Sequence, residues 1–156
     1  MDPRGLTRFF TAAILLVVGV VPASLGADWP QFRGPQQDGI SEESGLLETW
    51  PEAGPKVLWR KPLGDGFSAP SLVDGRMYVT FAENGQSFAA GLDAASGEEL
   101  WRTPLGQAFK DRFGQGPRAT PTVHDGVVYT LTANGQLHAL SAKDGTVSWH
   151  HDLRSE

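Results

Sequence analysis

The chain has 156 residues, no cysteine and a formal net charge of −5. Without cysteine there is neither a disulfide framework nor a cysteine that could be lipidated at the N-terminus. The acidic balance leaves one local basic cluster, Lys110-Asp111-Arg112. The acidic balance disfavours nucleic-acid binding, which needs a basic stripe along the phosphate backbone, and no nucleic-acid partner is predicted.

The chain begins with a pattern typical of a secretory signal. Arg4 and Arg8 precede an apolar run over 9–21, which is shorter than the roughly 20 residues of a membrane helix. Small residues then lead to Gly26, after which we predict cleavage. Residues 1–26 are therefore predicted to be a signal peptide, with a retained membrane anchor as the alternative. The product is expected to be exported, periplasmic or extracellular, without stable membrane insertion.

Residues 27–55 are rich in proline, glycine and glutamate and predict an ordered loop segment. Trp29 and Phe32 lie near its start. Large apolar side chains of this kind are seldom left on a solvated tail. We expect both to pack against the sheets that follow.

From residue 56 onward the sequence repeats itself. Residues 69–79 resemble residues 120–130, and residues 92–101 resemble residues 140–149. A tryptophan closes each unit. A period in the forties built from short alternating runs predicts stacked β units, since each unit can bury its apolar face only against a neighbour.

Asx-Gly and Ser-Gly pairs divide each unit into strands, because such pairs supply the positive φ of a tight hairpin turn. The pairs are Asp74-Gly75, Asn84-Gly85, Ser96-Gly97, Asp125-Gly126, Asn134-Gly135 and Asp144-Gly145. We predict four strands per unit, within blades at about 67–103 and 118–151. The predicted strands are Ser68–Val73, Arg76–Ala82, Ser87–Asp93 and Glu98–Thr103, then Ala119–His124, Val127–Ala133, Gln136–Ser141 and Thr146–His151.

The end of each unit resembles a motif of the quinoprotein-type (PQQ-like) β-propellers, A-x-D-x-x-[TS]-G-x-x-x-W. The first copy has Gly91 in place of the alanine, and the second has Ser141 and Asp144 in place of the aspartate and the threonine or serine. The matching residues are Asp93, Ser96, Gly97, Trp101, Ala139, Gly145 and Trp149. Residues 29–35 are similar to the opening of secreted, planctomycete-type members.

This resemblance implies an all-β fold over residues 56–156, made of β-propeller blades of four antiparallel strands. It also implies tryptophan docking, in which an indole lies on the glycine turn of a neighbouring blade. The predicted docking residues are Trp59, Gly97, Trp101, Gly145 and Trp149. An aromatic stacking role toward a sugar or a cofactor is the alternative for the tryptophans.

Propellers close with four to eight blades, whereas the sequence predicts two complete ones and an incomplete ring. We therefore expect an N-terminal fragment whose open face meets the remaining blades or a protein partner. Asp93 and Asp144 fall at turns and are interpreted as turn formers.

Compared with the first unit, the second is preceded by extra residues around 106–118. An insertion confined to one repeat often lies on the binding face. Within it, Phe109, Lys110, Asp111, Arg112 and Phe113 place mixed charge between aromatic rings, a composition typical of protein contacts. We interpret these five residues as a candidate interaction loop, with a solvated loop as the alternative.

The resemblance leaves two functions open. One is a non-catalytic binding or scaffold module like the BamB-type propellers of cell-envelope assembly, with no cofactor and a protein partner. The alternative is part of a PQQ-dependent alcohol or sugar dehydrogenase, which would need the quinone, calcium and an aspartate base. No catalytic residue is predicted. The four histidines, His124, His138, His150 and His151, do not share a strand face at i, i+2 spacing and are not predicted to bind metal.

Overall fold

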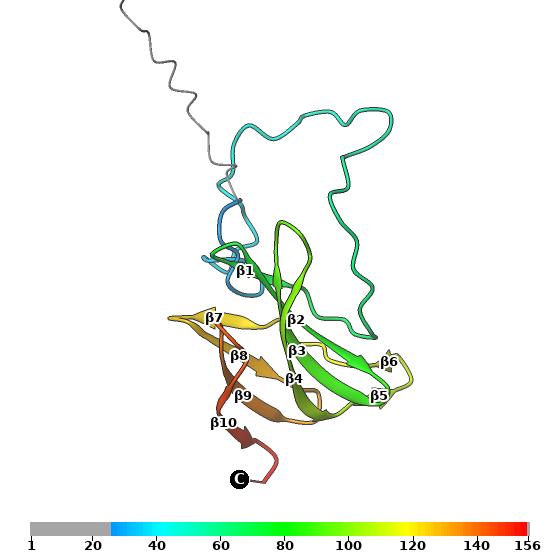
Figure 1. The fold of residues 1–156 in the computed structure, drawn as a ribbon, viewed down its shortest axis with the longest axis vertical. Coiled ribbons are helices and arrows are strands. Elements are labelled where there is room, and N and C mark those ends of the chain that lie inside the picture. The colour runs from blue at the N-terminus through cyan, green and yellow to red at the C-terminus, as the bar shows by residue number, and fades with distance from the viewer. Residues whose placement is uncertain (1–25, 156) are drawn as a thin grey trace, which may run out of the picture.

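Two four-stranded antiparallel sheets form the body of the computed structural model, which describes residues 26–155 (Figure 1). Nearly all of the predicted signal peptide lies outside these residues. The first sheet, blade 1, has the order β1-β2-β3-β4, and the second, blade 2, has the order β10-β9-β8-β7. A small hairpin, β5-β6, connects them. The all-β propeller-blade fold predicted from the sequence is confirmed. The bounds are β1 Ser71–Val73, β2 Arg76–Glu83, β3 Gln86–Asp93, β4 Glu99–Gln107, β5 Lys110–Asp111, β6 Gly114–Gln115, β7 Thr122–His124, β8 Val127–Leu131, β9 Gln136–Ser141 and β10 Val147–Asp152.

The hairpin turns lie where the Asx-Gly pairs predict them. Asp74, Asn84 and Asp125 have positive φ, as do the glycines that follow them. Two successive residues with positive φ make a type I′ turn, whose twist matches that of the flanking strands. The turns before β4 and β10 differ from these type I′ turns. A register shift within the sheet follows each of them. This shift is a β-bulge, and it decides which residues face each other farther along the strands.

Strand lengths differ from the prediction at both edges of the blades. The innermost strands β1 and β7 begin only after Pro70 and Pro121, because proline has no N–H to give to the ladder. The outermost strand β4 continues to Gln107, beyond the predicted end at Thr103. Pro104 is tolerated within it because β4 is an edge strand.

The main hydrophobic core lies between the two blades. Tyr78, Trp101 and Leu105 of blade 1 pack in one buried cluster with Val128 and Leu140 of blade 2. Neither sheet buries both of its faces alone, so each blade depends on its neighbour, as expected for a repeat architecture.

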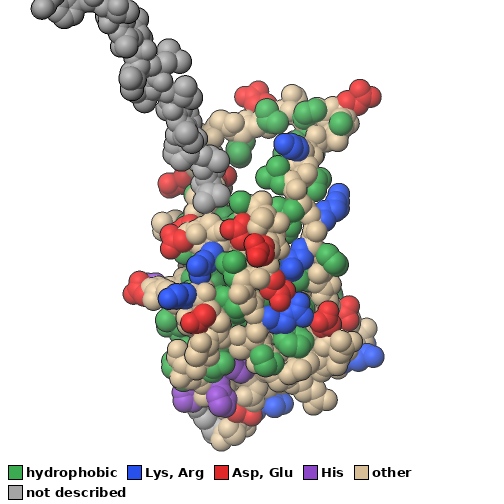
Figure 2. Space-filling view, in the orientation of Figure 1, with side chains coloured by type: hydrophobic (Ala, Val, Ile, Leu, Met, Phe, Trp, Pro, Cys, Tyr) green, Lys and Arg blue, Asp and Glu red, His purple; other side chains and the backbone are tan. Residues whose placement is uncertain are grey.

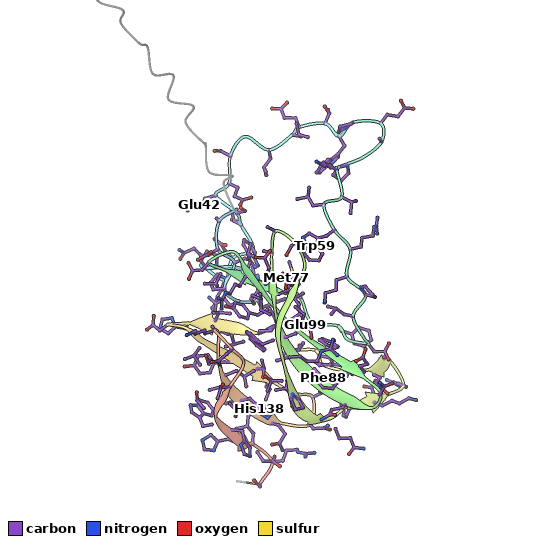
Figure 3. The ribbon with its side chains drawn as sticks, in the orientation of Figure 1. Glu42, Trp59, Met77, Phe88, Glu99 and His138 are labelled. Atoms are coloured by element: carbon purple, nitrogen blue, oxygen red, sulfur yellow. The ribbon has the colours of Figure 1, made fainter. Side chains whose placement is uncertain are left out.

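The opposite face of blade 1 carries a second cluster around Phe81, with Phe88, labelled in Figure 3, packed against it. The guanidinium of Arg102 lies over both rings, 4.9 Å and 5.5 Å from their centroids. Arg102 also binds Glu99 through two nitrogens, at 3.0 Å and 2.9 Å, and this lowers the pKa of the Glu99 carboxyl below its usual value. A planar guanidinium can serve both contacts, since it stacks and donates in its plane.

The N-terminal segment crosses the inner edges of both blades. Trp29 pairs with Leu72 of β1 through two backbone hydrogen bonds, 2.7 Å and 2.9 Å long, and the Pro30 carbonyl accepts one from Val123 of β7 at 2.8 Å. The Trp29 backbone therefore joins the sheet edge, and its half-buried indole lies against Gly34 of the same segment. Phe32 does not pack as predicted, because 67% of its surface is exposed.

Beyond this segment the chain makes a wide loop, coloured cyan to green, that leaves the sheets and returns before β1 (Figure 1). Several large apolar side chains are exposed along it, and green patches mark this part of the surface in Figure 2. They include Ile40, Leu46, Leu47, Trp50, Val57 and Leu58. Across residues 26–155, no helix is long and apolar enough to cross a membrane.

Candidate protein-interaction site

The extra residues between the blades form an ordered hairpin. Lys110 pairs with Gln115, and Asp111 with Gly114. The Gly116 amide donates to the Phe109 carbonyl at 2.9 Å and closes the hairpin. All five residues of the candidate interaction loop therefore lie in this element, on β5, at its tip and just before it.

Both blades hold the base of the hairpin. The Ala108 amide donates to the Gly85 carbonyl in the β2–β3 turn, at 2.9 Å. From blade 2, the Asn134 side-chain amide donates to the Gln107 carbonyl at 2.8 Å. The hairpin is thus attached to two separate sheets, which limits its motion relative to them.

Arg118 organises the interior of the hairpin. Its guanidinium lies 5.3 Å from the ring of Phe67 and 5.1 Å from that of Phe109. It also donates to the Asp111 carboxylate at 2.8 Å. Cation–π contacts of this kind contribute about 0.5–1 kcal/mol each at exposed sites, and more when desolvated. Arg118 therefore fixes one aromatic ring and the acidic residue of the loop.

The tip of the hairpin points away from the body. Asp111 accepts a hydrogen bond from the Phe113 amide at 2.9 Å, which makes an Asx turn. Arg112 stacks on Phe113 at 4.6 Å, and 69% of the Phe113 surface is exposed. An aromatic ring and an arginine side by side are typical of the residues that dominate binding energy at protein interfaces.

Phe67 and Arg118 also belong to this site, although neither was predicted from the sequence. Arg118 lies at the end of the extra segment, and Phe67 precedes β1 by four residues. No local pattern joins them; they meet because the Phe67 amide donates to the Pro117 carbonyl at 2.8 Å. A cavity of about 530 Å³ lies beside this contact, lined by Gly64, Asp65, Gly66, Phe67, Lys110, Gly114 and Gln115.

Two of the three predicted docking tryptophans lie on glycine turns. The Trp59 indole N–H donates to the Ala94 carbonyl at 3.0 Å, and the ring lies against Gly97. In the same way Trp101 donates to the Ala142 carbonyl at 3.1 Å and lies against Gly145. Only 8% of the Trp101 surface is exposed. The indoles therefore contact protein turns on both of these blades.

Trp149 occupies the corresponding place in blade 2, where no further turn covers it among the described residues. Its ring packs on Tyr129, with centroids 6.1 Å apart, and on His151, with centroids 5.3 Å apart. It remains 41% exposed. The row Tyr129–Ala139–Trp149 thus presents an open aromatic face at the far side of blade 2.

The two aspartates of the motif region are bound to their own turns. Asp93 accepts hydrogen bonds from the amides of Ala95 and Ser96 and from the Ser96 hydroxyl. Asp144 accepts one from the Thr146 amide at 3.1 Å. Hydrogen bonds from Ser96 and from Thr146 lower the pKa of Asp93 and of Asp144, respectively. Both carboxylates act as turn formers, as the sequence predicts, and they stay ionised.

Residues 26–155 contain no group of three or more histidine, cysteine, aspartate or glutamate side chains placed to hold a metal ion. Their two blades, packed through tryptophan and glycine turns, define the class of protein as a propeller of quinoprotein-type repeats.

The family model described as outer membrane protein assembly factor BamB, PQQ_2, matches residues 43–156. The chain belongs to this family. It is 26% identical over 152 residues to outer membrane protein assembly factor BamB of Salmonella typhimurium, covering 91% of this chain and 37% of that protein. The BamB of Burkholderia pseudomallei is 28% identical over 158 residues, covering 98% of this chain and 38% of that protein. The chain thus spans less than two fifths of the length of these relatives.

Solved structures that resemble the chain include BamB and alcohol and methanol dehydrogenases. BamB from Moraxella catarrhalis aligns with a TM-score of 0.38 at 19% identity, over 49% of this chain and 20% of that one. Quinohemoprotein alcohol dehydrogenase ADHIIG from Pseudomonas putida HK5 aligns with a TM-score of 0.45 at 28% identity, over 63% of this chain and 14% of that one.

Proposed function

We propose that this chain is an exported, non-catalytic propeller module that binds a protein partner during assembly of the cell envelope. Membership of the BamB family supports an assembly role. The export step rests on the predicted signal peptide, with the periplasm or the cell exterior as the destination. The predicted docking residues Trp59, Gly97, Trp101 and Gly145 act in this proposal as structural contacts between blades, and Trp149 would dock on a turn of a further blade.

The β5-β6 hairpin is the proposed contact surface. The observation that carries this proposal is the exposed Arg112–Phe113 pair, held on a base that Arg118 fixes through Phe109 and Asp111. A preorganised aromatic residue loses little side-chain entropy on binding, so its burial by a partner adds to the affinity. A loop that contacts only solvent needs no such internal support. The contacts that support the hairpin therefore favour an interaction loop over a solvated loop.

A photo-crosslinker at the hairpin tip tests this proposal. Phe113 is replaced by p-benzoylphenylalanine in the full chain, which is expressed in its source cells and irradiated. We expect one defined crosslinked product containing a protein of outer-membrane assembly, identified by mass spectrometry. The same product should disappear in the Arg112→Ala background, because the neighbouring guanidinium is part of the contact.

Phe32 supplies the matched control, since its exposure of 67% nearly equals that of Phe113 at 69%. A crosslinker at position 32 should not give the same product. Equal crosslinking from both positions, or crosslinking that persists with Arg112→Ala, would show that the hairpin is not the interface.

The proposal requires no quinone. Adding pyrroloquinoline quinone and Ca²⁺ to the purified chain should therefore leave the quinone absorption spectrum unchanged, and no quinone should co-elute with the protein in gel filtration. Stoichiometric co-elution that depends on Ca²⁺ would instead support the dehydrogenase alternative.

A further inference from the structure

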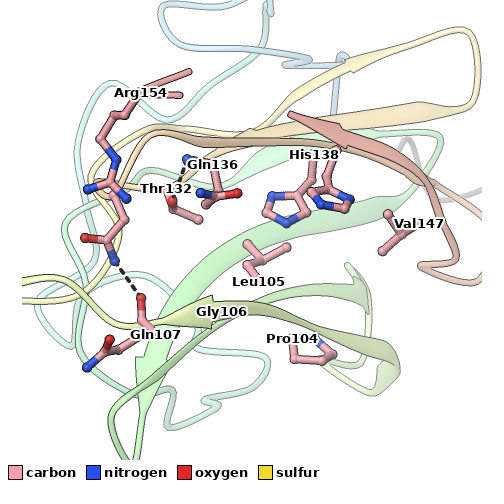
Figure 4. A pocket seen from close by; sticks show the side chains of 11 residues that line it. Pro104, Leu105, Gly106, Gln107, Thr132, Gln136, His138, Val147 and Arg154 are labelled. Atoms are coloured by element: carbon pink, nitrogen blue, oxygen red, sulfur yellow. Dashed lines mark hydrogen bonds between the residues drawn. The ribbon is translucent and has the colours of Figure 1, made fainter. Parts of the chain in front are cut away.

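A second cavity, of about 660 Å³, lies between the blades at the end far from the N-terminal segment (Figure 4). Blade 1 contributes the end of β4, from Pro104 to Gln107. Blade 2 contributes His138 from β9 and His150 from β10. In Figure 2 the purple histidine side chains gather toward this end of the molecule. The cavity adjoins the base of the hairpin at Gln107 and Asn134, but the β5-β6 hairpin itself does not line it.

The two imidazoles meet because of the bulge in β10. Val147 pairs with Leu140, but after the register shift Trp149 pairs with Ala139 and His150 with His138. Without the shift, His138 would face Trp149 instead. The two histidine rings lie nearly parallel, with centroids 5.8 Å apart and an angle of 24° between planes. Cross-strand pairs of this kind share one face of a sheet.

The pair is specific to blade 2. Thr130 pairs with His138 on the other side, so the row Thr130–His138–His150 crosses three strands. The corresponding row in blade 1 is Val79–Ala90–Arg102. The repeat architecture therefore does not require histidine at these positions.

Two polar atoms of this row are buried without a partner. They are Nδ1 of His138 and Oγ1 of Thr130. His138 is only 8% exposed, and buried polar groups without hydrogen bonds are rare because they are costly. Metal ions bind imidazole through a ring nitrogen that is free of protein partners, and Nδ1 of His138 makes no hydrogen bond to the protein.

We propose that His138 and His150 together bind one divalent transition-metal ion in this cavity, with Cu²⁺ the most strongly bound. Imidazole nitrogen suits Cu²⁺ and Zn²⁺, and Cu²⁺ stands highest in the order of affinities. A metal–nitrogen distance of about 2.0 Å to each ring allows ring centroids to lie up to about 6 Å apart when the two nitrogens bind on opposite sides of one ion. The observed separation of 5.8 Å lies within this limit.

The remaining coordination positions face the open cavity and are filled by water. His150 is exposed, so its ring can turn toward the shared ion, whereas the buried His138 is held in place. Arg154 also lines the cavity, and its charge is offset by Asp152 at 3.7 Å. The site is therefore a two-imidazole site, weaker than one with three protein ligands.

Isothermal titration of the full chain with CuCl₂ at pH 7.5 tests the proposal. One ion should bind, and electron paramagnetic resonance should show hyperfine coupling to two imidazole nitrogens. His138→Ala and His150→Ala should each weaken binding by about tenfold or more, since each removes one of two protein ligands. Because His150 is exposed, His150→Ala keeps the fold even if His138→Ala does not.

The chain offers two matched controls. His124 and His151 are exposed and lie outside the cavity, so His124→Ala and His151→Ala should bind Cu²⁺ as the unchanged chain does. Equal losses in these controls, absence of one-to-one binding, or a two-imidazole signal that survives His150→Ala would each overturn the proposal.

Discussion

Replacing Trp101 by alanine should lower the free energy of unfolding by about 3–5 kcal/mol, the range found when large core aromatics are truncated. The indole is buried between the blades, in the same cluster as Tyr78 and Leu140. The substitution removes this packing and also leaves the Ala142 carbonyl without its indole donor. Unfolding in urea, followed by far-ultraviolet circular dichroism, measures the change.

Trp50→Ala is the control for the loss of a tryptophan as such. Trp50 is 66% exposed on the wide loop, and surface substitutions usually change stability by less than about 0.5 kcal/mol. Similar losses for Trp50→Ala and Trp101→Ala would mean that the inter-blade contact does not stabilise the fold.

Gly91→Ala should destabilise the chain by about 1–3 kcal/mol, the usual cost of overpacking a core. An added Cβ at Gly91 would clash with the indole nitrogen of Trp101. The indole is rigid and fixed at its far side by Gly145, so it cannot yield cheaply. Urea unfolding again gives the magnitude.

A double-mutant cycle identifies the cause of this loss. If the methyl group clashes with the indole, Gly91→Ala should cost little in the Trp101→Ala background, because the coupled residues are in contact. If Gly91→Ala lowers the stability equally in the Trp101→Ala background, the loss arises within strand β3 and not from a clash with the indole.

Gly91 also shows which features of the fold could be predicted from the sequence and which could not. The propeller motif has alanine there, and blade 2 has Ala139 at the matching place. In blade 1 the bulge pairs Gly91 with Trp101, whose indole lies directly against it. The Asx-Gly turns and the strand order followed from local chemistry. The bulges did not, since they shift the register by one residue without a clear signal in the sequence.

The candidate sites, like the fold, could be predicted from the sequence only where a local pattern marks them. The sequence placed Phe109 to Phe113 in a candidate loop, because an insertion and its composition can be read along the chain. It missed Arg118 over Phe67, a contact made only by folding. The His138–His150 pair was not predicted either. In a regular ladder that starts at the Asp144-Gly145 turn, His138 would lie opposite Trp149. Only the bulge brings the two imidazoles together.

The attachment of the N-terminal segment has a consequence for the order of folding. Trp29 and Pro30 bind strands β1 and β7, which lie far along the chain and in different blades. Contacts between residues distant in sequence form late, because the intervening chain loses much conformational entropy when they close. A chain synthesised from its N-terminus therefore produces this segment first and docks it last. Until both blades have formed, the inner edges of β1 and β7 stay open to other strands.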